Sequence, residues 1–127
     1  MLCTPVPPVV GPVGGISQLT GEEDESVTLN FEITRATPAV LVENIRWIYS
    51  PDFSVVPSGN MNEDITNSTN RIMKSSFMFN ADLLSLTITN IAQARERNEP
   101  TDSGRYFLIA TNPAGTRYSY IDLLVEG

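Results

Sequence analysis

Apolar and polar residues alternate along several short stretches of the chain. In residues 26–33 every second side chain is apolar, and these side chains are Val27, Leu29, Phe31 and Ile33. Residues 44–50 repeat the pattern with Ile45, Trp47 and Tyr49. A period of two places such side chains on one face of a β-strand, so each stretch predicts a strand with one buried face.

Weaker versions of the same pattern continue to the end of the chain. The remaining predicted strands cover residues 16–19, 71–79, 84–91, 104–111 and 117–125. Residues 112–115, Asn-Pro-Ala-Gly, suit a tight turn between the last two strands. The polar residues 51–70 predict a loop or a short edge strand. Residues 20–25 predict an acidic turn, for which a solvated loop is favoured over a calcium site formed by the acidic residues 22–25. Many short strands joined by turns indicate an all-β sandwich or barrel.

The chain has the length of one domain. Its 127 residues are enough to bury a hydrophobic core without help from a second domain. Residues 1–15 are rich in Pro and Gly and predict an extended segment able to supply an edge strand, while residues 16–127 form the domain itself. Four prolines interrupt the first thirteen residues, so these do not resemble a signal peptide, and we expect the chain to be a piece of a longer protein.

Composition removes several classes of function. The net charge of −7 argues against a nucleic-acid-binding protein, which carries a basic patch. The absence of histidine excludes Ser–His–Asp and Cys–His catalysis and His-ligated zinc sites. The single cysteine, Cys3, excludes an intrachain disulfide, and its own partner stays open. We therefore expect no cofactor and no metal ion, and no enzyme, because only carboxylates, Tyr106, Lys74 or Cys3 remain for chemistry.

Several of these segments together resemble a known family. Residues 102–108, Asp-Ser-Gly-Arg-Tyr-Phe-Leu, resemble the D-S-G-x-Y-x-C signature of immunoglobulin-superfamily domains, with Leu108 at the cysteine position. Residues 26–31 resemble the strand B pattern S-V-T-L-x-C, with Phe31 at the other cysteine position. Trp47 matches the strand C tryptophan, and residues 84–88 and 110–115 are similar to strand E and the F–G hairpin. The resemblance implies an immunoglobulin-like two-sheet Greek-key sandwich of the V-set or I-set without an intrachain disulfide.

The resemblance also implies roles for individual residues. Phe31, Trp47, Tyr106 and Leu108 would form the centre of the core, with the Tyr106 hydroxyl bonded back to the backbone as in a tyrosine corner. Loss of the disulfide costs about 2–5 kcal/mol, and burial of Phe31 offsets about 1.5–3 kcal/mol of it. Arg71 would pair with Asp102, and Lys74 is the weaker alternative. Residues 92–101 carry an insertion that we expect at the end of the sandwich opposite the 112–115 turn.

The outer face of the sheet formed by strands C, F and G is the candidate site. If Trp47, Tyr106 and Leu108 point inward, their neighbours point outward and form an unusually apolar face. The predicted protein-binding residues are Arg46, Ile48, Arg105, Phe107, Ile109, Tyr118, Tyr120 and Leu124. Tyr-rich surfaces with Arg at the rim are typical of protein interfaces. The competing interpretation is that a neighbouring domain, the N-terminal strand or a bulge in the last strand covers or redirects these side chains.

The resemblance implies a protein-binding recognition or adhesion module on the extracellular side of the plasma membrane. Its partner would be another copy of the same receptor or a related cell-surface protein, and a homodimer would result. Loss of both core cysteines is similar to the allorecognition receptors of colonial hydroids, which bind homophilically. The alternative is an intracellular structural I-set module, as in giant muscle proteins. The sequon Asn67-Ser68-Thr69 favours the secreted context, because a glycan on Asn67 requires the secretory route.

Overall fold

The computed structural model describes residues 4–59, 62–66, 77–92 and 101–126. Within these residues the chain forms strands, two short 3-10 segments and no α-helix. The 3-10 segments are η1 (Val13–Gly15) and η2 (Val42–Asn44). The strands are β1 (Val6–Pro12), β2 (Gln18–Glu22), β3 (Val27–Thr37), β4 (Ile45–Ser50), β5 (Glu63–Asp64), β6 (Phe77–Phe79), β7 (Ser85–Ile88), β8 (Gly104–Asn112) and β9 (Gly115–Glu126).

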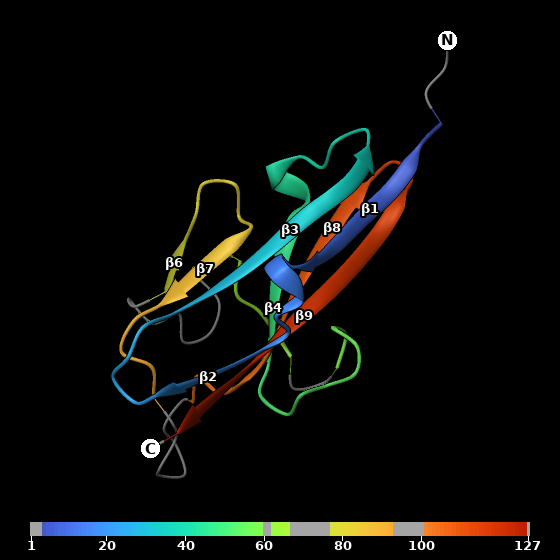
Figure 1. Ribbon diagram of the computed structural model, residues 1–127. Helices are drawn as coiled ribbons and strands as arrows, with labels where there is room; N and C mark the ends of the chain where they lie inside the picture. The colour runs from blue at the N-terminus through green and yellow to red at the C-terminus, as the bar shows by residue number, and fades with distance from the viewer. Residues whose placement is uncertain (1–3, 60–61, 67–76, 93–100, 127) are drawn as a thin grey trace.

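The strands make two sheets that lie face to face (Figure 1). The four-stranded sheet has the order β1-β3-β7-β6, and the five-stranded sheet has the order β2-β9-β8-β4-β5. The chain passes from one sheet to the other between β1 and β2, between β2 and β3, at the 38–44 connection, and on each side of the β6–β7 hairpin. This arrangement of crossings gives the two-sheet sandwich that the strand pattern predicts.

The first two strands of the chain lie in different sheets. β1 pairs antiparallel with β3 as the edge strand of the four-stranded sheet, a position that tolerates proline, and the register with β3 shifts between Val6 and Val9, at Pro7 and Pro8. The chain then crosses at η1, where Gly14 and Gly15 take positive φ angles of 69° and 73° that few other residues adopt. After the crossing, β2 pairs parallel with β9 in the other sheet.

The core lies between the two sheets, around Trp47. The side chains of Phe31, Trp47, Tyr106 and Leu108 are all buried, and Leu108 lies directly opposite Trp47 in the β4–β8 register. The Phe31 ring approaches from the other sheet and meets the indole edge-on, with 5.2 Å between ring centroids. The indole Nε1 donates to the Leu83 carbonyl at 2.7 Å, so the polar atom of this buried ring has a partner.

The Asp-Ser-Gly sequence before β8 fixes the end of the sandwich through three different contacts. The Tyr106 hydroxyl donates to the Asp102 carbonyl at 2.7 Å, which is the expected corner bond. The Asp102 carboxylate accepts from the Ala92 N–H at 2.7 Å, and the Ser103 hydroxyl oxygen accepts from the Val125 N–H at 2.9 Å. A Cβ on Gly104 would lie 2.5 Å from the ring of Tyr49, so this close approach requires glycine.

Some boundaries differ from those that the pattern predicts. β3 continues to Thr37, beyond the predicted end at residue 33, because β1 pairs with this extra length. The predicted strand at 16–19 lies instead at Gln18–Glu22, since β9 supplies its partner strand. Arg71, Lys74 and residues 93–100 lie outside the described residues. Ala92 and Asp102, which flank the predicted insertion, lie at the start of β8, away from the β8–β9 turn.

Candidate protein-binding face

The outer face of the β4–β8–β9 sheet carries the predicted site. The β8–β9 register is continuous from Gly104 opposite Leu123 to Asn112 opposite Gly115, so no bulge redirects the side chains of β9. Ile121, Leu123 and Val125 therefore point into the core. Tyr118, Tyr120 and Leu124 alternate with them and are 44%, 36% and 37% exposed.

Two predicted contact residues on this face are buried, and their assignment as contact residues is wrong. Ile48 is 6% exposed and Phe107 is fully buried, although both side chains lie on the outer side of the sheet. The cause is the 51–59 segment, which folds back over the face. The Ser54 carbonyl accepts from Arg105 Nη1 at 3.0 Å, and Pro57 and Ser58 line a small pocket with Ile48 and Ile109.

Phe107 is the centre of a second aromatic cluster. Its ring meets the rings of Tyr118 and Tyr120 edge-on, at centroid distances of 5.7 and 6.0 Å. Both tyrosines come from β9, where they lie opposite Ile109 and Phe107. The tyrosines thus shield Phe107 on one side and present their own outer surfaces to solvent.

Arg105 and Asp122 form a closed ion pair beside the tyrosines. Arg105 Nε lies 2.8 Å from Asp122 Oδ1 and Nη2 lies 3.1 Å from Oδ2, which is the bidentate geometry that favours this pairing. These hydrogen bonds from the Arg105 guanidinium raise its pKa above the usual value. The guanidinium also lies 3.9 Å above the ring of Tyr120. Each side chain of the pair is only 17% exposed, so Arg105 is not a free rim charge.

Arg46 lies at the other side of the face, on β4. Its Nη2 is 2.7 Å and its Nε 2.9 Å from Oδ2 of Asp64, which lies on the short strand β5. Burial opposes ionisation of Asp64, but hydrogen bonds from Arg46 and Thr66 outweigh burial and hold the pKa of the carboxyl below its usual value. The Arg46 side chain is 58% exposed, and the pair is therefore accessible to a partner.

Sequence reasoning missed two exposed residues on this face. Val55 and Val56 lie in the covering segment and are 81% and 45% exposed. Hydrogen bonds hold the segment around them: Asp52 Oδ1 accepts from the hydroxyls of Ser50 and Ser54, which lowers the pKa of the Asp52 carboxyl. Asn62 Nδ2 donates to the Val56 carbonyl at 3.1 Å. The available signal was the Val-Val pair within an otherwise polar stretch.

The exposed apolar residues of this face form one surface, which we call the outer patch. Arg105 links the 51–59 segment to the tyrosines of β9, because its guanidinium contacts both the Ser54 carbonyl and the ring of Tyr120. The outer patch consists of Val55, Val56, Tyr118, Tyr120 and Leu124. Ile109 lies half-buried at its margin. Contiguous exposed apolar side chains of this kind are uncommon on a monomer and mark interaction surfaces.

Neither a metal site nor a membrane span is found in the described part of the chain. No three of its acidic or other metal-ligating side chains gather closely enough to hold an ion. None of the helical segments described there has the length and apolar character needed to cross a bilayer. Cys3 and Asn67 lie outside the residues that the structure describes.

Comparison with solved protein structures identifies the fold. No protein-family model matches the chain, and no curated protein sequence matches it. Among solved structures, extracellular domains 3–5 of Drosophila OTK match 97% of this chain and 33% of that one, with a TM-score of 0.63 at 21% identity. The N-terminal four Ig domains of Dscam1 isoform 4.44 match 99% of this chain and 26% of that one, with a TM-score of 0.61 at 17% identity. The fold is immunoglobulin-like.

A structure of a titin domain complex matches as well. A chain in the complex of titin M10 with obscurin-like 1 covers 94% of this immunoglobulin-like domain and is itself covered to 94%, with a TM-score of 0.56 at 17% identity. The chain spans only 33% of the OTK fragment and 26% of the Dscam1 fragment, which hold several domains each. Identities at this level establish the architecture, and the function has to be argued from the surface.

Proposed function

We propose that this immunoglobulin-like domain is a protein-binding recognition module of a cell-surface receptor, and that a second copy of the receptor binds to its outer patch. The observation that supports the proposal most strongly is the exposure of Tyr118 and Tyr120, whose rings both pack against Phe107 on one sheet face. Tyrosine is enriched at the centre of protein interfaces because its ring buries a large area at a low entropy cost.

The charges of this face suit a contact that excludes water. Arg105 and Asp122 already neutralise each other through two hydrogen bonds, so covering them leaves no charge without a partner. A partner of the same kind would bring the same face, and a two-fold axis makes such a contact self-complementary. Each copy carries a net charge of −7, so the attraction has to come from an apolar contact and not from the overall charge.

The extracellular setting is supported by the OTK match, whose domains are extracellular. Phe31 and Leu108 at the two cysteine positions further support a receptor similar to the hydroid allorecognition receptors. The match to titin M10 in complex with obscurin-like 1 favours a second candidate, an intracellular structural module that binds another such domain. A glycan on Asn67 in protein from its natural source would exclude the second candidate, and recovery of the protein from the cytosol would exclude the first.

The homophilic contact can be tested by introducing charge into the outer patch. We expect Val56→Asp and Tyr118→Asp each to weaken self-association about thirty-fold, the factor that corresponds to a contact residue worth about 2 kcal/mol. Sedimentation equilibrium of the purified domain and aggregation of beads coated with it are the measurements. Added salt should strengthen the association of the unaltered domain, because it screens the repulsion between two acidic copies.

The matched control is Val42→Asp. Val42 is 46% exposed and Val56 is 45% exposed, but Val42 lies on η2, in the connection between β3 and β4, and lines a different pocket from the one beside the 51–59 segment. Val42→Asp should leave self-association unchanged. The proposal is wrong if both outer-patch variants fold, as judged by circular dichroism, and associate as strongly as the unaltered domain.

A further inference from the structure

One edge of β3 is paired over only half of its length. β7 pairs with residues 27–30 of β3, and the Phe31 N–H donates to the Leu84 carbonyl at 2.8 Å. The chain turns away immediately before Leu84, where the Leu83 N–H donates to the Asn80 carbonyl at 3.0 Å. β1 lies along the opposite edge of β3 as far as Thr37. From Ile33 onward, no strand among the described residues lies on the β7 side of β3.

The backbone of Ile33 is directed toward this unpaired side. Successive residues of a strand direct their N–H and C=O groups to alternate edges. Phe31 directs its N–H toward β7, so Ile33, two residues later, directs its N–H and C=O the same way. The irregularity in the β1–β3 register comes after Ile33, between the pairs Val10–Ile33 and Val9–Arg35, and does not change this direction.

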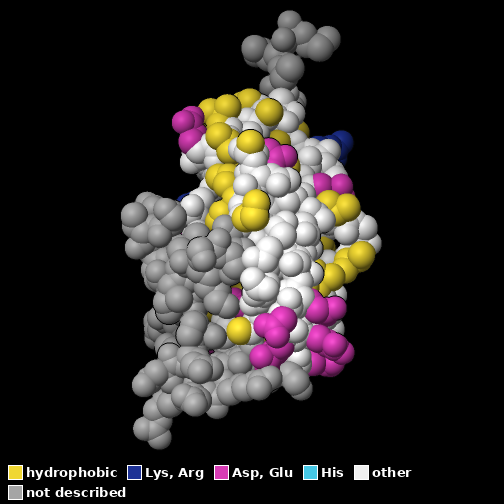
Figure 2. All heavy atoms as spheres, turned by 90° about the vertical axis from the view of Figure 1, so that its left-hand side faces the viewer, with side chains coloured by type: hydrophobic (Ala, Val, Ile, Leu, Met, Phe, Trp, Pro, Cys, Tyr) yellow, Lys and Arg dark blue, Asp and Glu magenta, His cyan; other side chains and the backbone are white. Residues whose placement is uncertain are grey.

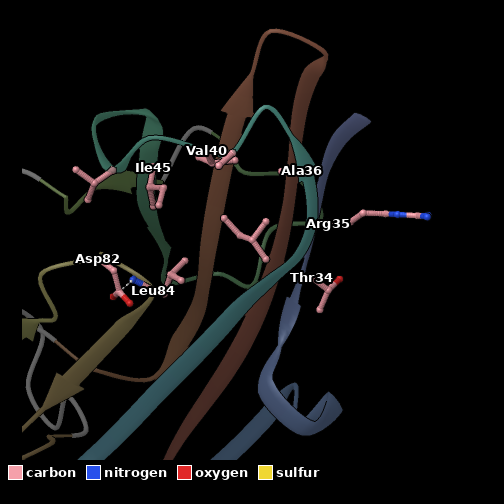
Figure 3. A pocket seen from close by; sticks show the side chains of 10 residues that line it. Thr34, Arg35, Ala36, Val40, Ile45, Asp82 and Leu84 are labelled. Carbon is pink, nitrogen blue, oxygen red and sulfur yellow. Dashed lines mark hydrogen bonds between the residues drawn. The ribbon is translucent and has the colours of Figure 1, made fainter. Parts of the chain in front are cut away.

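A pocket of about 420 Å³ adjoins the unpaired edge. Figure 3 shows Val40 and Ile45 beside the gap between β3 and the turn that carries Asp82 and Leu84, whereas Arg35 extends away from the gap. The other apolar lining residues are Ile33, Ala36, Ala39, Val42 and Leu84. The volume lies within the range of sites that hold ligand groups, and the lining suits an aliphatic side chain.

The surroundings of the pocket are mostly apolar, and the charged residues that line it are Arg35 and Asp82. Leu41 and Val42, on the connection that leads into β4, are 57% and 46% exposed. Figure 2 shows hydrophobic side chains gathered at the upper end of this side of the molecule, with acidic side chains gathered at the lower end. Asp82 at the pocket is exposed, and its Oδ1 accepts from the Leu84 N–H at 3.0 Å.

We propose that the free edge of β3 binds an extended peptide segment of a partner protein, as an added strand that continues the line of β7 beyond the 80–83 turn. Backbone bonds to Ile33 supply part of the affinity, and an aliphatic side chain in the pocket supplies specificity. A Lys or Arg of the segment lies beside Asp82.

The charge of the domain favours such a segment over a second copy of this chain. The chain has 15 acidic and 8 basic residues, so its net charge of −7 attracts a basic peptide and repels its own kind. Asp82 adds a local negative charge at the pocket, and Arg35, which also lines the pocket, extends its charged end away from the gap (Figure 3). This site is separate from the outer patch, which lies on the other sheet, and the two proposals can fail independently.

A displayed library of random ten-residue peptides tests the site. Peptides are selected on the unaltered domain and counter-selected on Val42→Asp, and one enriched peptide is synthesised. We expect alternating aliphatic residues next to Lys or Arg. The peptide should bind Val42→Asp at least about ten-fold more weakly than the unaltered domain and should slow amide exchange of Ile33 at least about ten-fold. Val56→Asp, matched in exposure but in the outer patch, should bind the peptide normally.

A second variant keeps the test independent of any damage by Val42→Asp. Asp82→Asn retains the side-chain oxygen that accepts from Leu84 and removes only the charge. It should weaken binding of the basic peptide and reduce the dependence of that binding on salt. The proposal is overturned if no enriched peptide distinguishes Val42→Asp from Val56→Asp, or if the bound peptide leaves the exchange of Ile33 unchanged.

Discussion

Trp47 and Phe107 lie on opposite faces of the same sheet, and each is the centre of three aromatic rings. Trp47 has Phe31 and Phe79 edge-on at 5.2 and 5.5 Å, and Phe107 has Tyr118 and Tyr120 at 5.7 and 6.0 Å. Both central side chains are fully buried. The Trp47 cluster is closed by a second sheet, whereas the Phe107 cluster is closed by its own strand neighbours and by the 51–59 segment.

A side chain on a sheet can therefore be fully buried without a second sheet to cover it. Around Trp47 the covering ring of Phe31 is itself buried and that of Phe79 is partly buried. Around Phe107 the covering tyrosines are partly exposed to solvent. The ring of Tyr120 also contacts the guanidinium of Arg105, which lies 3.9 Å above it. The inner cluster therefore serves stability alone, and the outer cluster combines a buried centre with a surface that a partner can contact.

The largest effect is expected at the inner cluster. Trp47→Ala removes both edge-on contacts and the bond to the Leu83 carbonyl, and leaves a cavity between the sheets. We expect the free energy of unfolding to fall by about 4 kcal/mol, measured by urea denaturation. A loss below about 1 kcal/mol would mean that this cluster is not the centre of the core.

Phe107→Ala tests whether the outer aromatic cluster contributes to stability as the inner one does. Because Phe107 is as buried as Trp47, we expect a loss of about 3 kcal/mol in the free energy of unfolding, although the residue lies on the outer face. Tyr118→Ala is the control, since Tyr118 is 44% exposed and should cost about 1 kcal/mol or less. Equal losses for the two variants in urea denaturation would contradict the layered description of this cluster.

The smallest effect is expected at Asp64, at the edge of the outer face. Its pKa is held below the unfolded value of about 3.9, so its stabilising contribution is present above that pH and is lost as the pH falls through the folded value. The contribution should be under about 1 kcal/mol, because Arg46 is 58% exposed. Urea denaturation at about pH 7 and about pH 3 measures it, and Asp64→Asn should show a smaller change with pH than the unaltered domain. An identical change in both proteins would exclude this role.

Alternation along the chain predicted which side of each strand faces the core, because that information is local. A period of two places Trp47 on the inner side of its strand, whereas Tyr106 and Leu108 lie in a run of five apolar residues and were assigned inward from the resemblance to the D-S-G-x-Y-x-C signature. The turn after Asn112 follows from its own residues. Residues 34–37 do not alternate, and they form part of β3 only because β1 lies beside them. That pairing joins segments about twenty-five residues apart, which no local pattern contains.

The exposure of residues on the outer face was predicted less well, because it too depends on a segment from elsewhere in the chain. Alternation assigned Ile48 and Phe107 to the correct side of the sheet but could not tell that the 51–59 segment covers that side. The same segment places Val55 in the solvent, where a polar loop was expected. The predicted Arg71–Asp102 ion pair and the sequon at Asn67 involve residues outside the described part of the chain and stay predictions.

The parallel pairing of β2 with β9 has a mechanical consequence. The two strands are joined by five register pairs, from Gln18 opposite Asp122 to Glu22 opposite Glu126, and the two ends of the chain lie at opposite ends of the sandwich (Figure 1). Tension that draws these ends apart along the strand axis loads all five pairs in shear at the same moment. The pairs then share the force, unlike the strands of a hairpin, which unzip one bond at a time.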